Sequence, residues 1–121
     1  MGDELTEKII GAAIEVHRLL GPGLLESIYE EALKHELLLR NVPCESQIQI
    51  TVRYKNILIE GQRLDLLVGN EVVVELKSVS RLPDVATAQV LSYLKATGLK
   101  RGLLINFGEP LLKNGIKRLS L

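Results

Sequence analysis

Three charged residues interrupt an apolar stretch between Arg63 and Ser78: Asp65, Glu75 and Lys77. The run from Val72 to Lys77 reads as a buried strand, because β-branched and aliphatic residues dominate it. Glu75 and Lys77 are two residues apart, so on a strand they share a face. Burying both charges is costly unless each is paired or bound to something. Two carboxylates and a lysine that converged at one point would suit a divalent cation beside an activated water molecule.

The position of Asp65 relative to Glu75 depends on the loop between two predicted strands. A two-residue loop of Gly69 and Asn70 places Asp65 opposite Val74, facing away from Glu75. A loop of three residues places Asp65 opposite Glu75, and Arg63 opposite Lys77, because one residue of slip moves the whole set. Gly69 and Asn70 both tolerate positive φ, so either loop is allowed. A metal site therefore requires the three-residue loop, or a bulge with the same effect.

Other candidates lie on predicted helices. Glu26 falls in a first turn, where spacing alone favours a surface carboxylate that interacts with the helix dipole, although its face could also point toward the sheet. Gln89 and Tyr93 are four residues apart and so lie on one helix face, where they read most simply as a surface amide and a half-buried aromatic. His17 is expected to be packed or partly exposed rather than a metal ligand, because no second His or Cys stands at ligand spacing.

The chain predicts an α/β fold in the order helix, helix, three antiparallel strands, helix, strand and short strand. Apolar periodicity and breakers predict helices over 3–20, 25–40 and from the Arg81–Asp84 entry to Thr97, and strands over 47–54, 57–68 with a bend at Gly61, 72–79, 100–107 and 116–119. The strand over 100–107 follows a helix, so it is expected to pair parallel to an earlier strand. The predicted inner faces are Leu5, Ile9, Ala12, Ala13, Val16, Leu19 and Leu20 on the first helix, and Leu25, Ile28, Tyr29, Ala32, Leu33 and Leu37 on the second.

Composition narrows the classes of function. A length of 121 residues predicts one domain over 1–121, and net charge zero with only three Tyr and one Phe counts against a duplex-coating protein and against base stacking as the main binding mode. The single Cys44 excludes an internal disulfide and fits the reducing cytoplasm. The acidic start Met1–Glu4 is followed by no apolar core of a signal peptide, and no apolar run is long enough to span a membrane.

Taken together, the motifs and their order resemble the PD-(D/E)XK nuclease superfamily, especially its RecB-like branch. The chain looks most like the small GxxExxY family, whose motif stands here as Gly23-Leu24-Leu25-Glu26-Ser27-Ile28-Tyr29. Similar phrases stand at 21–26, 74–77 and 102–108, so the resemblance covers nearly the whole chain. It implies a restriction-endonuclease-like core, with a central mixed sheet flanked by helices. Leu64 replaces the proline of the superfamily's Pro-Asp pair.

The resemblance also implies roles for the candidate residues. Asp65, Glu75 and Glu26 would be metal ligands for Mg²⁺ or Mn²⁺, and Lys77 would orient or deprotonate the attacking water, with Asp65, Glu75 and Lys77 as the catalytic set. Gln89 and Tyr93 would match a Gln-x-x-x-Tyr motif that lines the site. The implied activity is hydrolysis of phosphodiester bonds in DNA, with RNA as a second candidate substrate. The alternative is a nuclease-fold nucleic-acid-binding or protein-interaction module with little cleavage activity, and a homo-oligomer is left open.

Overall fold

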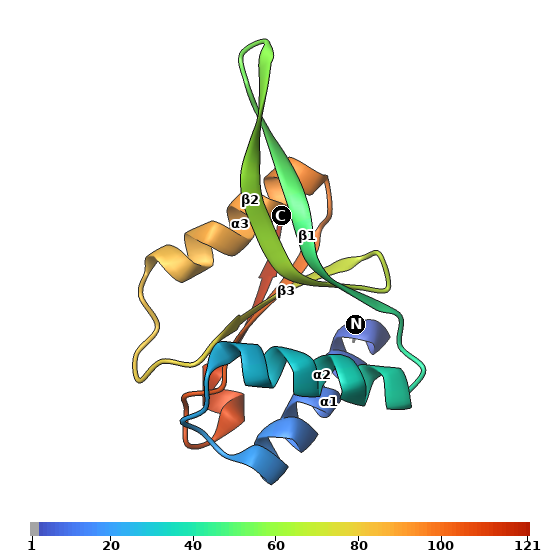
Figure 1. The fold of residues 1–121 in the computed structure, drawn as a ribbon, viewed down its shortest axis with the longest axis vertical. Coiled ribbons are helices and arrows are strands. Elements are labelled where there is room, and N and C mark those ends of the chain that lie inside the picture. The colour runs from blue at the N-terminus through green and yellow to red at the C-terminus, as the bar shows by residue number, and fades with distance from the viewer. Residues whose placement is uncertain (1–2) are drawn as a thin grey trace.

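The computed structural model describes residues 3–121 as a small α/β domain built on one five-stranded mixed sheet (Figure 1). Met1 and Gly2, from the acidic start noted above, lie outside the described residues. The elements are α1 (Glu4–Leu20), α2 (Glu26–Leu39), β1 (Cys44–Tyr54), β2 (Ile57–Val68), β3 (Val72–Lys77), α3 (Val85–Thr97), β4 (Arg101–Asn106), a 3-10 turn η1 (Leu112–Gly115) and β5 (Ile116–Ser120). The strand order β1-β2-β3-β4-β5 is antiparallel except for the parallel β3–β4 pair. The predicted α/β class, meander and crossover are confirmed.

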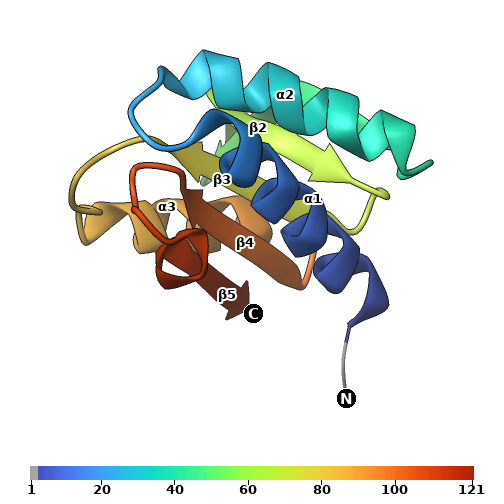
Figure 2. The same ribbon diagram turned by 90° about the horizontal axis from the view of Figure 1, so that it is seen from below.

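The helices form a layer on each face of the sheet. Figure 2 shows α1 and α2 together on one face and α3 on the other. Buried side chains of α1 and α2, including Ile9, Tyr29 and Leu33, pack against β2, β3 and β4 in the larger core. Val90, Tyr93 and Leu94 of α3 fill smaller cores on the opposite face. A residue at the end of an interior strand, between these layers, can therefore be approached from both α2 and α3.

Near the connection between α1 and α2, four residues that were predicted to be buried are exposed. Leu19, Leu20, Leu25 and Ile28 are 66%, 41%, 75% and 47% exposed, although apolar periodicity placed all four inside. The end of α1 and the start of α2 project beyond the sheet, so the last apolar turns have nothing to cover. The ends themselves follow capping rules: the Asp3 side chain accepts a hydrogen bond from the Thr6 N–H, and Gly98 ends α3 with φ of 77°.

The β2–β3 turn produces the register that a metal site requires. Gly69 and Asn70 both have positive φ, and the Glu71 N–H donates to the Val68 carbonyl at 3.1 Å, as in a two-residue turn. Val68 nevertheless pairs with Val72, so Glu71 is an extra, bulged residue. The Glu71 carboxylate is held outside the ladder by Arg101 at 2.9 Å. Extending the register by one residue places Asp65 opposite Glu75, which confirms the bulge alternative.

The outer part of the β1–β2 hairpin, residues 51–62, projects from the body as a twisted two-stranded arm (Figure 1). It begins where the register shifts beyond Ile50, opposite Gly61 with φ of 122°. Five large apolar side chains of the arm are between 44% and 61% exposed: Val52, Tyr54, Ile57, Leu58 and Ile59. The sequence predicted these strands and the bend at Gly61, but not that the arm stands clear of the core.

Strand ends differ from the prediction by a few residues for identifiable reasons. β3 ends at Lys77 rather than Val79, because the Asn106 side chain replaces the next strand contacts: its Oδ1 accepts from the Val79 N–H and its Nδ2 donates to the Val79 carbonyl. β1 begins earlier than predicted, at Cys44, which pairs with Val68. Within residues 3–121, no helix has both the length and the apolar character needed to cross a membrane.

Candidate functional site

Asp65 and Glu75 meet where β2 leaves β3. The ladder between these strands covers only Leu66–Val68 and Val72–Val74, so Arg63 does not reach the position opposite Lys77 expected from a continued ladder. Beyond the end of this ladder, side chains replace the missing backbone hydrogen-bond partners. The Asp65 N–H donates to Glu75 Oε1 at 2.8 Å, and the Leu76 N–H donates to Asp65 Oδ2 at 2.9 Å. Each carboxylate is thus fixed through one oxygen by a backbone N–H of the other strand.

Bringing these two carboxylates together has an electrostatic cost. Glu75 is only 3% exposed, and this burial is the main reason why its pKa rises from 4.5 to about 8. The neighbouring charge of Asp65 raises the pKa of Glu75 further, while the Asp65 N–H and the Lys77 ammonium oppose the rise. In the absence of a cation, the pair therefore favours a proton over a second negative charge. Such a pair is a natural position for an external cation.

This cost predicts an unusual pH dependence for the metal-free protein. Because the pKa of Glu75 is higher in the folded protein, the folded state holds a proton that the unfolded chain has released between pH 4.5 and about 8. The contribution of Glu75 to stability should therefore be full at the acid end of this window and be lost as pH rises through it. Urea unfolding in EDTA should show this decline in wild type and a flatter profile in Glu75→Gln. An equally steep decline in Glu75→Gln would contradict the assignment, with Glu31→Gln as the exposed control.

Lys77 and Glu26 lie beside the carboxylate pair. Loss of solvation raises the pKa of Glu26, the ammonium of Lys77 opposes that rise, and the charge of Asp65 adds to it. The first turn of α2 therefore lies near the end of β3, and Glu26 itself is exposed there. The Ser78 hydroxyl, directly after Lys77, donates to the Leu24 carbonyl in the loop before α2. This contact ties the strand that carries Lys77 to the helix that carries Glu26.

Tyr29 gives the Gly-x-x-Glu-x-x-Tyr spacing a structural reason. Its hydroxyl donates to the Gly21 carbonyl and accepts from the Leu24 N–H at 3.1 Å, so it closes the loop that precedes α2. Its fully buried ring stacks on Phe107 with centroids 4.4 Å apart and planes 7° apart. The tyrosine therefore anchors the loop in the core one turn after Glu26. That anchor fixes where the helix starts and which way Glu26 points.

Sequence reasoning did not select Glu30 or Gln47 as site residues. Burial raises the pKa of Glu30, a hydrogen bond from Gln47 opposes this rise, and the charge of Asp65 adds to it, so Glu30 also lies close to the carboxylates. The Gln47 amide donates to Glu30 Oε1 at 2.9 Å. Gln47 has a φ of 53°, rare for a residue that is not glycine, and it sits where β1 would pair with Asp65. Such strain often marks functional positions. The i, i+4 spacing of Glu26 and Glu30 was the only available sequence signal.

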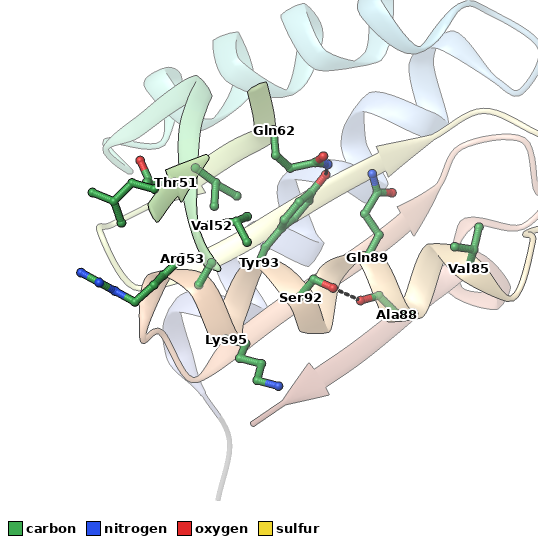
Figure 3. A pocket seen from close by; sticks show the side chains of 13 residues that line it. Thr51, Val52, Arg53, Gln62, Val85, Ala88, Gln89, Ser92, Tyr93 and Lys95 are labelled. Carbon is green, nitrogen blue, oxygen red and sulfur yellow. Dashed lines mark hydrogen bonds between the residues drawn. The ribbon is translucent and has the colours of Figure 1, made fainter. Parts of the chain in front are cut away.

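Gln89 and Tyr93 approach the carboxylates from α3, on the other side of the sheet. Figure 3 shows both side chains rising from α3 toward Gln62 of the arm, and the Gln62 Nε2 donates to the Tyr93 hydroxyl at 2.5 Å. Burial raises the pKa of the Tyr93 phenol, the Gln62 and Gln89 amides oppose the rise, and the charges of Glu75 and Asp65 add to it. Tyr93 therefore lies between the carboxylate pair and the arm. Gln62 is a further neighbour that no sequence motif indicated.

Donors for a metal ion are present, but they do not form a complete cage. Within residues 3–121, no three Asp, Glu, His or Cys side chains are gathered closely enough to hold a metal. His17 stays outside the site, as expected, because it is buried and its Nε2 lies 2.8 Å from the Glu109 carbonyl. Mg²⁺ usually takes one or two carboxylates, keeps several waters and recruits substrate phosphate. The adjacent Asp65 and Glu75 fit that mode of binding, and in the described part of the chain Glu26 does not complete a three-residue ligand group with them.

The chain is similar to one known protein family. The family model described as the PD-(D/E)XK nuclease superfamily matches residues 3–119, nearly the whole chain. No curated protein and no solved structure gives a significant match. The matched range includes Asp65 and Glu75, where β2 and β3 separate. It also includes the start of α2 and the face of α3 that carries Gln89 and Tyr93.

Proposed function

We propose that this chain, which belongs to the PD-(D/E)XK nuclease superfamily, is a Mg²⁺- or Mn²⁺-dependent nuclease that hydrolyses phosphodiester bonds of DNA. The observation that carries the proposal is the Asp65–Glu75 pair, in which a half-buried and a buried carboxylate lie side by side and the pKa of Glu75 rises to about 8. In a purely structural pair of this kind, the two negative charges repel each other, and one backbone N–H for each carboxylate offsets only part of that cost. A bound divalent cation would remove the repulsion.

The residues around the pair have complementary roles in the proposal. A bound Mg²⁺ or Mn²⁺ would stabilise charge on the phosphate oxygens and lower the pKa of a bound water molecule. Asp65 and Glu75 would hold the cation, and Lys77 would orient the attacking water or accept its proton. Glu26 would support the site from the start of α2, through water rather than directly. Gln89 and Tyr93 would position substrate from the α3 side.

A non-cleaving nucleic-acid-binding or protein-interaction module is the second candidate. It is favoured by the incomplete ligand set, since no three acidic or other ligand side chains gather within the described part of the chain, and by the net charge of zero. The paired carboxylates beside Lys77 favour the nuclease, because a module that only binds an anionic backbone gains nothing from placing the buried Glu75 next to the half-buried Asp65.

The proposal also covers the branch of the family, the substrate, the role of Lys77, the cellular location and the oligomeric state. The Gly23–Tyr29 motif, with Tyr29 anchoring the loop before α2, supports assignment to the GxxExxY family. DNA rather than RNA is proposed as substrate, and Lys77 as the catalytic base or water-orienting group. We also propose a cytoplasmic location, which the lone Cys44 supports. The exposed apolar side chains of the arm and of the α1–α2 connection leave room for a homo-oligomer.

Cleavage assays on the purified protein test this function. Single- and double-stranded DNA and RNA would be incubated with wild type in Mg²⁺, Mn²⁺ or EDTA, beside Asp65→Asn and the exposed-carboxylate control Glu31→Gln. We expect metal-dependent cleavage of DNA by wild type and by Glu31→Gln, and none by Asp65→Asn. Cleavage that survives EDTA or Asp65→Asn would overturn the metal mechanism. Absence of cleavage by wild type on all four substrates would favour the non-cleaving module.

A further inference from the structure

A groove of about 980 Å³ runs between the arm and α3 and leads to the candidate site. Its inner end is formed by Gln62, Gln89 and Tyr93, which lie side by side in Figure 3. Tyr93 is also the α3 residue close to Glu75 and Asp65. Through Tyr93, one wall of the groove therefore adjoins the carboxylate pair.

The charges of the groove favour an anionic ligand. Only two lining residues carry a charge, and both are cations: Arg53 on the arm and Lys95 on α3. Both are exposed, and within residues 3–121 neither makes a salt bridge, whereas Arg18, Arg40 and Arg101 each pair with a carboxylate. In a chain with net charge zero, this leaves a local positive groove that ends at an acidic pair suited to a cation. That order of charge fits a phosphate backbone whose reacting phosphate lies at the metal.

The uncharged walls of the groove distinguish a single strand from a duplex. Val52, Leu58 and Val85 line it and are 44%, 61% and 68% exposed. A duplex keeps its base faces stacked inside, where such side chains cannot reach them, whereas the bases of an unpaired strand are free to pack on apolar surface. The Gln62 and Gln89 amides add donors and acceptors that suit exposed base edges.

We propose that the groove between the arm and α3 binds a single, unpaired nucleic acid strand, with Arg53 and Lys95 on its phosphates, and directs it to Asp65 and Glu75. The inference rests on the proposed function for the choice of ligand. It adds the strandedness of the substrate and two binding residues that lie outside the carboxylate and lysine set. The groove walls take the bases, and the two cations fix the backbone.

Binding can be measured separately from cleavage. Fluorescence anisotropy in EDTA would compare one labelled oligonucleotide as single-stranded DNA, as its RNA equivalent and as a duplex. The test variant is Arg53→Gln/Lys95→Gln, and the matched control is Lys113→Gln/Lys117→Gln, which removes two exposed cations that do not line the groove. We expect wild type to prefer the unpaired strand. The test variant should bind it roughly tenfold more weakly, with a salt slope smaller by about 1.4, or 0.7 for each lost phosphate contact.

The outcomes separate this inference from the proposed function. Equal binding by the test variant and the control, tighter binding of the duplex, or no binding by wild type would each overturn the groove assignment. Single-strand binding lost only in the test variant supports it, even if wild type then cleaves nothing in Mn²⁺ and the proposed function fails. If wild type does cleave, the same variant should raise KM and leave kcat nearly unchanged, because neither residue touches the carboxylate pair.

Discussion

Replacing Lys77 with alanine is expected to reduce cleavage by ~10²–10⁴-fold, the usual contribution of a general acid–base group. Lys77 is half-buried at the end of β3, and its charge acts on both Glu75 and Glu26. Binding of Mn²⁺ should survive the substitution, because Asp65 and Glu75 remain in place. Single-turnover cleavage and Mn²⁺ titration on the same preparation measure the two effects separately.

The Lys77→Ala variant also distinguishes a catalytic role of Lys77 from a purely structural one. If Lys77 served only to compensate the buried Glu75, its loss would destabilise the fold by roughly 3–5 kcal/mol at a pH above the raised pKa of Glu75, because an unpaired buried carboxylate would then remain. Thermal melting decides between the two roles, with exposed Lys113→Ala as the matched control. A Lys77→Ala protein that melts near the wild-type temperature and cleaves at the wild-type rate would remove Lys77 from the mechanism.

The second large effect is expected from Gly108→Ala. A Cβ at Gly108 would lie 2.1 Å from the Val79 carbonyl oxygen and 2.7 Å from the Val79 N and C atoms. These are backbone atoms that the Asn106 side chain holds in place, so they cannot move aside cheaply. Because overpacking commonly costs about 1–3 kcal/mol when side chains can adjust, a loss of about 3 kcal/mol or more is expected here. Urea unfolding measures it directly.

The Gly108→Ala protein should also lose activity, because the strand that carries Lys77 is bonded to the residue before Gly108. The Phe107 N–H donates to the Lys77 carbonyl at 2.8 Å. Gly11→Ala provides the control. Gly11 lies inside α1, and its Cβ would meet only the flexible end of Arg40 at 3.3 Å. That change should raise stability by roughly 0.5–1 kcal/mol, as alanine does in helix interiors. A Gly108→Ala protein as stable as wild type would show that the Val79 backbone can move aside without cost.

Much of the fold could be predicted from local patterns, because the strands, breakers and helix ends act over a few residues. From the sequence, the register that places Asp65 opposite Glu75 could be stated only as a requirement for a metal site and not as an outcome. Gly69 and Asn70 allow either loop, and the choice is associated with Glu71, which Arg101 holds outside the ladder from 30 residues away. No local pattern reports an ion pair of that separation.

Two other features lay beyond sequence reasoning for similar reasons. Apolar periodicity identified the α1 and α2 faces but could not show where the sheet beneath them ends, so Leu19 and Leu25 were placed in the core and are exposed. Gln47 adopts positive φ although glutamine has no local preference for it, so its contact with Glu30 depends on the assembled site. Both errors concern relations between elements rather than the elements themselves.

Calorimetric titration with Mn²⁺ tests Asp65 and Glu75 as a metal site most directly, because it requires no assumption about the substrate. Wild type and Glu31→Gln, whose changed carboxylate is exposed on α2, should give the same binding heats. Asp65→Asn should lose them, because the proposed site has only two direct carboxylate ligands and depends on both. Heats from Asp65→Asn equal to those of wild type would contradict the metal site and, with it, the proposed nuclease.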